Sequence, residues 1–141
     1  MNRIGLALAV LVTISPLTLA LARSVQAVDG QTKQAQANQP EQFVQRIFLN
    51  LISAIEENNY IKFISQGNDA FKEAITKQIF TKVNGQLSPR LKKGYSAVFL
   101  GKLNQQGYQV YLWKLSFKDG NDDVLARLSL KDGKVGGFWL N

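Results

Sequence analysis

The sequence of 141 residues contains no cysteine and no histidine. The lack of cysteine excludes disulfide bonds, thiolate metal sites and a cysteine nucleophile. The lack of histidine excludes every mechanism that depends on imidazole, together with most zinc and iron sites. No phosphate-binding loop, Gly-x-Ser-x-Gly motif or dinucleotide fingerprint is present. Because no catalytic constellation is recognisable, we expect a protein that is not an enzyme and that uses no cofactor or metal.

The acidic residues offer no buried general base. Four of them fall in predicted turns: Asp119, Asp122, Asp123 and Asp132. The spacing Asp119-Gly-Asn-Asp-Asp123 is similar to the start of a calcium loop. However, Val124 stands where an EF-hand needs glycine, and Leu130 stands where it needs the bidentate glutamate. The segment is therefore interpreted as a polar hairpin rather than a cation site.

The N-terminal pattern predicts export. A single positive charge at Arg3 precedes the charge-free run from Ile4 to Ala22, and the chain then reaches Val25-Gln26-Ala27, a small-x-small signal peptidase site. We expect a signal peptide at 1–27 and a mature protein in the periplasm or outside the cell. The alternative is an uncleaved membrane anchor at 4–22. Residues 28–40 are rich in glutamine and small residues, which is typical of a flexible linker.

The remaining segment, 41–141, predicts one domain that begins with helices. Apolar residues recur at helical spacing from Glu41 to Glu57, with Phe43 and Ile47 among those on the inner side. A short apolar piece at Tyr60–Ile64 predicts one or two further helical turns. Asn68 or Asp69 can cap the segment after it. A third helix is predicted from Thr76 to about Leu87, with Ile79 facing inward and with Pro89 among the residues that end it.

The last third of the chain predicts an antiparallel sheet. Four apolar segments, at 95–103, 108–117, 123–130 and 134–140, are separated by short turn sequences. Connections this short allow only antiparallel neighbours. In the second segment, both parities are apolar: Tyr111 and Trp113 lie on one face, and Tyr108 and Leu112 on the other. We therefore expect one face beneath the helices and the other partly exposed.

Helices followed by a curved four-stranded sheet are the order of an α+β roll. In Glu56-Glu-Asn-Asn-Tyr60, in the segment 108–117 and in the ending Leu128-Ser-Leu-Lys-Asp-Gly-Lys-Val-Gly-Gly-Phe138, the chain resembles the nuclear transport factor 2-like superfamily, also called cystatin-like. The resemblance covers about 100 residues and implies a cone-shaped roll. The enzymes of that superfamily work inside the cone with an aspartate base, often helped by histidine or tyrosine. This chain departs from them because it has no histidine.

Two surfaces and one interior region are candidates for binding. Basic residues gather on the third helix and its exit. With two aromatic residues of the sheet they form the predicted partner surface: Lys82, Arg90, Lys92, Lys93, Tyr111 and Trp113. The mouth of the cone is the predicted pocket, lined by Tyr60, Tyr95, Phe99 and Trp139. Gly136 and Gly137 leave the last strand bare, where a partner could approach closely or the sheet could bend.

Two hypotheses for the function arise from these patterns. The first is an exported non-catalytic binding or structural domain that contacts a protein partner, an anionic surface or a second copy of itself through the sheet face. The second is a carrier of a small apolar ligand, or a weak enzyme without histidine, that uses the mouth of the cone. Nucleic acid is not expected as a partner of an exported chain. A cone packed solid by core residues would count against the second hypothesis.

Overall fold

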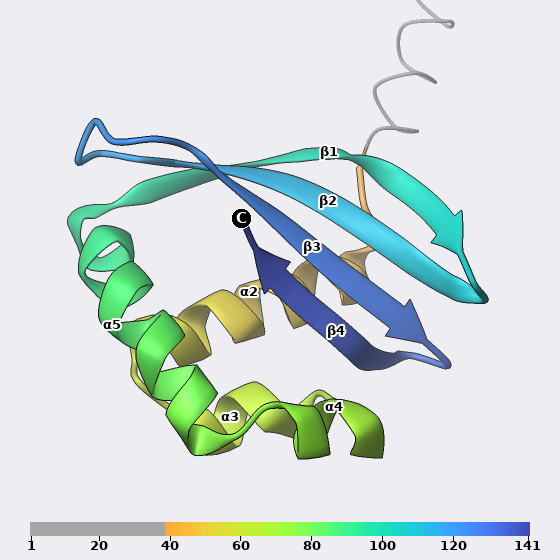
Figure 1. Ribbon diagram of the computed structural model, residues 1–141. Helices are drawn as coiled ribbons and strands as arrows, with labels where there is room; N and C mark the ends of the chain where they lie inside the picture. Colours follow the sequence, from red (N-terminus) through yellow and green to blue (C-terminus); the bar gives the residue numbers. More distant parts are fainter. Residues whose placement is uncertain (1–38) are drawn as a thin grey trace, which may run out of the picture. The chain divides into compact units, whose positions relative to one another are not determined.

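The computed structural model describes residues 39–141 (Figure 1). The predicted signal peptide, the alternative anchor and most of the predicted linker lie outside these residues. In the described part, no helix combines the length and the apolar character needed to cross a membrane. The described chain is an α+β domain in which the helices come first and four antiparallel strands follow. This confirms the coarse fold class predicted from the sequence.

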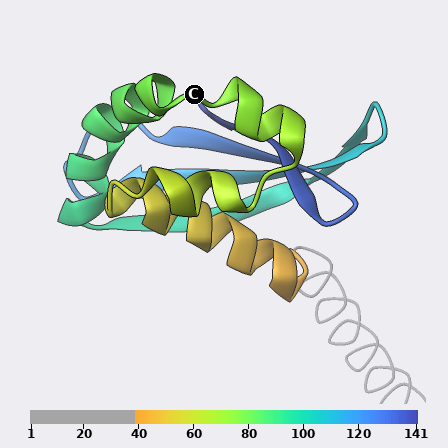
Figure 2. The same ribbon diagram turned by 90° about the horizontal axis from the view of Figure 1, so that it is seen from below.

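The first described helix, α2 (Gln42–Glu56), covers one face of the sheet (Figures 1 and 2). Its apolar stripe is buried, as the helical spacing predicts: Val44, Ile47, Phe48, Leu51, Ile52 and Ile55. Phe43, which the spacing places on the same side, remains 43% exposed at the start of the helix. Phe48 stacks on Trp113 of the sheet with ring centroids 4.1 Å apart and ring planes within 8°. This contact fixes the helix to the centre of the sheet.

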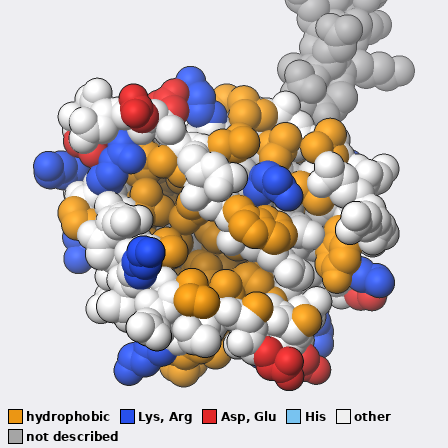
Figure 3. Space-filling model, viewed as in Figure 1, with side chains coloured by type: hydrophobic (Ala, Val, Ile, Leu, Met, Phe, Trp, Pro, Cys, Tyr) orange, Lys and Arg blue, Asp and Glu red, His pale blue; other side chains and the backbone are white. Residues whose placement is uncertain are grey.

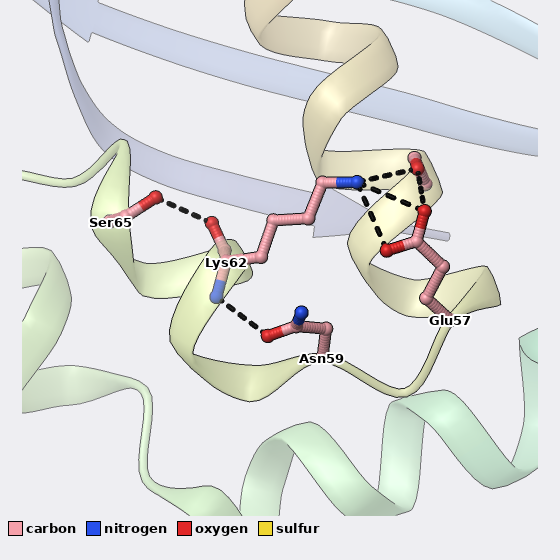
Figure 4. A network of polar contacts seen from close by, with 5 residues as sticks. Glu57, Asn59, Lys62 and Ser65 are labelled. Carbon is pink, nitrogen blue, oxygen red and sulfur yellow. Dashed lines mark hydrogen bonds and ion pairs between the residues drawn. The ribbon is translucent and has the colours of Figure 1, made fainter.

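The short helix α3 (Tyr60–Ser65) turns back against the end of α2. Figure 4 shows how the turn is held: the Lys62 ammonium donates to the Glu57 carboxylate at 3.0 Å and to the Ser53 hydroxyl at 2.8 Å. Asn59 caps the helix by accepting from the Lys62 backbone N–H. Hydrogen bonds from Ser53 and Lys62 lower the pKa of Glu57. The Glu57 carboxylate therefore stays ionised at neutral pH, and its contact with Lys62 orients α3 across the end of α2.

A helix that the sequence did not predict, α4 (Asp69–Ala74), comes next. Asn68 caps it by accepting from the Phe71 N–H, so the predicted cap is confirmed even though the helix was missed. Asn68 also donates its backbone N–H to Val135 of the last strand at 2.9 Å, and Val135 donates to Gln66 at 2.9 Å. The loop before α4 therefore covers the beginning of that edge strand.

The last helix, α5 (Lys77–Lys93), runs past Pro89, so the predicted end near Leu87 is wrong. A proline inside a helix removes one hydrogen bond and costs about 3 kcal/mol. Tertiary contacts outweigh this cost here: Leu87 and Leu91 are buried, and the Ser88 hydroxyl donates to the Glu56 carbonyl at 3.0 Å. The helix ends at Gly94, whose positive φ of 107° suits glycine.

The sheet is a meander in the order β1-β2-β3-β4, and its two edge strands do not pair to close a barrel. The strands are β1 (Tyr95–Gln105), β2 (Tyr108–Phe117), β3 (Val124–Lys131) and β4 (Lys134–Leu140). Gln106-Gly107 and Asp132-Gly133 supply the positive-φ pairs of the first and last hairpins. The register shifts between Phe99 and Gly101 in β1, and such a bulge bends a strand.

Candidate functional site on the uncovered face of the sheet

The two faces of the sheet differ in what covers them. The face with Tyr111, Trp113 and Leu115 lies beneath the helices, where each of these side chains is at most 1% exposed. None of the described helices covers the opposite face (Figure 1). Figure 3 shows part of this face. Several of its apolar residues are exposed: Val98, Leu100, Leu103, Leu125 and Trp139. We call this side, with Arg127 near its middle, the uncovered face.

A hollow of about 660 Å³ lies on the uncovered face between the β1–β2 hairpin and β4. We call it the Arg127 hollow. It is lined by residues from all four strands and the first hairpin turn: Gln105, Gln106, Tyr108, Val110, Arg127, Ser129, Gly136 and Trp139. Arg127 is the only charged residue in this lining. The hollow therefore offers one cation, several neutral polar groups and two aromatic rings.

Arg127 lies on β3 between Leu112 of β2 and Trp139 of β4. Its guanidinium carbon is 5.0 Å from the centre of the Trp139 indole, within the range of a cation–π contact. The Nε atom is buried, and no acceptor in residues 39–141 receives its hydrogen bond. A buried donor that is left without an acceptor costs about 1–3 kcal/mol, and more when it is charged. Arg127 also lines the hollow, so its guanidinium can meet an acceptor that enters from another molecule.

Two glycines of β4 make room for the aromatic rings of the hollow. A Cβ at Gly136 would lie 2.5 Å from Cε1 of Tyr108, and a Cβ at Gly137 would overlap the Trp139 indole. Both rings can therefore lie directly on the backbone of β4, which a side chain at either position would prevent. The register between β3 and β4 also shifts between Ser129 and Leu130, beside these glycines. The bare stretch noted in the sequence thus accommodates two of the chain's own rings and a bend.

The structure divides the predicted partner surface. Tyr111 and Trp113 are each 1% exposed beneath the helices, so their assignment to an accessible surface is wrong. Tyr111 donates its hydroxyl to Gln109, and burial raises its pKa to about 12. The sequence showed two apolar parities in β2 but could not show which one the helices cover. The helices cover the face that carries Tyr111 and Trp113.

Among the predicted basic residues, Lys82, Lys92 and Lys93 are exposed on α5. Arg90 differs from them because it is already paired. Its Nε donates to Oδ2 of Asp119 at 2.7 Å, and its Nη2 donates to the Asp122 carbonyl at 2.8 Å. Its guanidinium also lies 3.9 Å above the Phe117 ring. Arg90 thus joins α5 to the β2–β3 loop, and its positive charge is already paired with the Asp119 carboxylate.

The Arg90–Asp119 pair predicts a dependence of stability on pH. Hydrogen bonds from Arg90 and from the Asn121 backbone lower the pKa of Asp119 from its ordinary 3.8 to about 2. Between these values the unfolded chain binds more protons than the folded one, so the free energy of unfolding decreases as the pH falls from about 4 to about 2. Asp119→Asn removes this contribution. We expect the variant to lose less stability over this interval than the wild-type protein.

Urea denaturation at about pH 4.5 and about pH 2.5 measures this difference. Asp122→Asn is the matched control, because only the backbone carbonyl of Asp122 accepts from Arg90. Equal losses for Asp119→Asn and the wild-type protein would contradict the role given to the pair.

The predicted pocket residues are not brought together. Tyr60 packs against Phe80 and donates its hydroxyl to the Ile75 carbonyl at 2.8 Å. Phe99 packs against Trp113, and Tyr95 is half-buried at the start of β1. Trp139, by contrast, lies on the uncovered face of the sheet, where it lines the Arg127 hollow. The prediction that these four residues form one pocket is therefore wrong.

A second hollow, of about 420 Å³, separates α5 from β4, and we call it the apolar cleft. Figure 3 shows hydrophobic side chains at the bottom of a depression in this region. Its lining is mostly apolar and includes Ile79, Val83, Phe80, Phe138 and Leu140. Ile79 was predicted to face the core, but it is 46% exposed at this cleft. The described domain is thus not packed solid on this side.

Arg127 is the residue that the sequence interpretation missed. It is the one charge in the interior of β3 (Val124–Lys131), where every other interior residue except Ser129 is apolar, and the strand contains no acidic residue. A charge in such a position is costly unless it has a partner, which is the signal that could have identified it. Within residues 39–141, no group of three or more acidic side chains is arranged to hold a metal ion.

Comparison with known proteins adds no relative: no family model, no curated protein and no solved structure matches the chain.

Proposed function

We propose that this chain is an exported, non-catalytic binding domain that holds an anionic group of its ligand or partner in the Arg127 hollow. The observation that carries the proposal is the position of Arg127: it lines an open hollow that contains no carboxylate, and its buried Nε has no acceptor in the described domain. A guanidinium presents several donors in a rigid fork that matches a carboxylate or a phosphate. The exposed apolar residues elsewhere on the uncovered face, among them Val98 and Leu100 of β1, add surface that a larger partner can cover.

The carboxyl groups support a non-catalytic role. General acid or base work near neutral pH needs a carboxyl whose pKa is raised by burial. In residues 39–141, the carboxyl groups with a shifted pKa have it lowered by hydrogen bonds and by neighbouring cations: Glu41, Glu57, Asp119 and Asp123. These groups are therefore held in the ionised form, and none of them lines the Arg127 hollow.

We also propose that the domain is a cone-shaped roll of the nuclear transport factor 2-like superfamily. The order of helices before an antiparallel meander supports this assignment, as does the bulge at Phe99 and Gly101 that bends β1. An anionic group also fits the net charge, which is +7 for the whole chain and +5 without Arg3 and Arg23 of the segment 1–27 (15 basic and 10 acidic residues). Nucleic acid is not proposed as the source of that group, because export by the N-terminal segment 1–27 would separate the protein from it.

Titration with sodium acetate and with inorganic phosphate at constant ionic strength tests the anion site. The indole N–H signal of Trp139, followed by NMR, reports on binding because this ring adjoins the guanidinium. Arg127→Gln should weaken binding at least about tenfold, the loss of one charge-assisted hydrogen bond. Arg127→Lys should give an intermediate result, because lysine keeps the charge but not the fork.

Arg46→Gln is the matched control, since it removes the same charge from an exposed position on α2. Its anion binding should equal that of the wild-type protein. If Arg127→Gln also binds both anions as tightly as the wild-type protein, the proposal is wrong.

A second candidate function is carriage of a small apolar ligand in the apolar cleft. The specific observation is a cleft of about 420 Å³ whose lining is mostly apolar. The two candidates differ in their dependence on charge. A ligand of the apolar cleft should bind equally well to the wild-type protein and to Arg127→Gln.

A further inference from the structure

The size of the Arg127 hollow indicates a ligand larger than a bare anion. Its volume of about 660 Å³ lies within the roughly 300–1,000 Å³ that small-molecule sites occupy. It is an open depression on the uncovered face, so a residue of a longer molecule could also enter it. A carboxylate or phosphate bound to Arg127 would fill only one side. The rest of the ligand must then suit the other lining residues.

That lining favours a ring with hydroxyl groups. Gln105, Gln106 and Ser129 supply neutral donors and acceptors, and Val110 is the only aliphatic side chain. The indole of Trp139 is 45% exposed although it lies on Gly137. A sugar ring has this combination: apolar C–H faces that stack on an aromatic ring, and hydroxyl groups that bond to amides and hydroxyls at its edge.

The charge of the hollow selects an acidic form of such a ring. Arg127 has no acceptor for Nε, and Lys131 lies just outside with its ammonium 5.6 Å from the centre of the Tyr108 ring. No aspartate or glutamate lines the hollow. A planar guanidinium pairs with a planar carboxylate through two parallel hydrogen bonds. A neutral sugar would leave Arg127 without this partner.

A peptide fits the hollow less well. Peptides bound in extended form usually add to a free strand edge, where main-chain hydrogen bonds supply affinity. Here the floor is formed by β2 and β3, which are central strands paired on both sides. The lining also has no apolar side-chain pocket of the kind that such peptides use.

Resting on the proposed anion site, we infer that the Arg127 hollow is a subsite for a carboxylated sugar, a uronate residue. The carboxylate pairs with Arg127, the ring stacks on Trp139, and the hydroxyls bond to Gln105, Gln106 and Ser129. The rest of the uncovered face is then available for adjoining residues of an acidic polysaccharide.

Galacturonate and galactose form a matched pair of probes, because they share a ring and differ in the carboxylate. NMR titration at constant ionic strength should show galacturonate binding at least tenfold tighter than both galactose and acetate. Arg127→Gln should reduce the affinity for galacturonate to that for galactose. Trp139→Leu should weaken the binding of galacturonate but leave the binding of acetate unchanged. Because this variant lacks the indole, the NMR signal of the Arg127 backbone amide reports its binding.

Different failures identify which part is wrong. If acetate and phosphate bind through Arg127 but galacturonate binds no tighter than acetate, the anion site stands and the sugar inference falls. If phosphate binds more tightly than galacturonate, or if N-acetylglycine does, the ligand is a phosphate compound or a peptide carboxylate instead. If no anion depends on Arg127, both the inference and the proposed function fall. Urea denaturation of each variant confirms that it is folded.

Discussion

Replacing Trp113 by alanine is expected to lower the free energy of unfolding by about 3–5 kcal/mol, the usual cost of removing a large buried aromatic side chain. Trp113 is 1% exposed and stacks on Phe48. It also contacts Phe99 at 5.3 Å and Tyr111 at 6.2 Å between ring centroids. Because the free energy of unfolding of a small domain is only about 5–15 kcal/mol, we expect the variant to be strongly destabilised or unfolded.

The chain provides its own control, since its only other tryptophan is Trp139. That side chain is 45% exposed, so Trp139→Ala should cost less, about 1–2 kcal/mol. Urea denaturation followed by far-ultraviolet circular dichroism compares the two variants without relying on tryptophan fluorescence. Equal costs for the two substitutions would contradict the placement of α2 over Trp113.

Replacing Gly137 by alanine is expected to destabilise the domain and to disturb the Arg127 hollow. The new methyl group would overlap the Trp139 indole, so the ring must leave its place on β4. Forcing extra volume into a packed position costs about 1–3 kcal/mol. Because the displaced ring no longer adjoins Arg127, galacturonate should also bind more weakly than to the wild-type protein, whereas acetate binding should not change.

Gly85→Ala is the matched control for this substitution. Gly85 lies in α5, and a Cβ there meets no atom within 4 Å. Alanine in place of glycine inside an exposed helix should stabilise the domain by about 0.5–1 kcal/mol. The two substitutions are thus expected to change the free energy of unfolding in opposite directions. A neutral or stabilising Gly137→Ala would show that the indole does not occupy the space above that glycine.

Local patterns were sufficient to predict much of the fold. The helical spacing of apolar residues predicted α2, and alternating apolar segments with Asp-Gly turns predicted the four strands. Errors arose where tertiary contacts override local preference. Pro89 would end an isolated helix, but the buried Leu87 and Leu91 hold α5 together beyond it.

The candidate site was only partly predictable. The sequence indicated that one face of β2 would be exposed, but it could not identify the face, because both parities are apolar. It placed Tyr111 and Trp113 on the partner surface, whereas α2 covers them. The Arg127 hollow depends on the register of β3 with β4 and on the rings that lie over Gly136 and Gly137. Such cross-strand contacts are fixed by pairing, which the order of residues in one strand does not reveal.

The most direct test of the central claim is the Arg127 Nε–H signal in a ¹H–¹⁵N NMR spectrum during titration with sodium acetate. Sodium chloride at equal ionic strength serves as the reference, and Arg46 and Arg90 provide comparison signals in the same spectrum. Arg90 already donates to Asp119, and Arg46 is exposed on α2. We predict a saturable shift of the Arg127 signal with acetate alone, while the other two signals remain unchanged. An Arg127 signal that does not move, or that moves equally with chloride, would contradict the claim that this guanidinium is an anion-binding site.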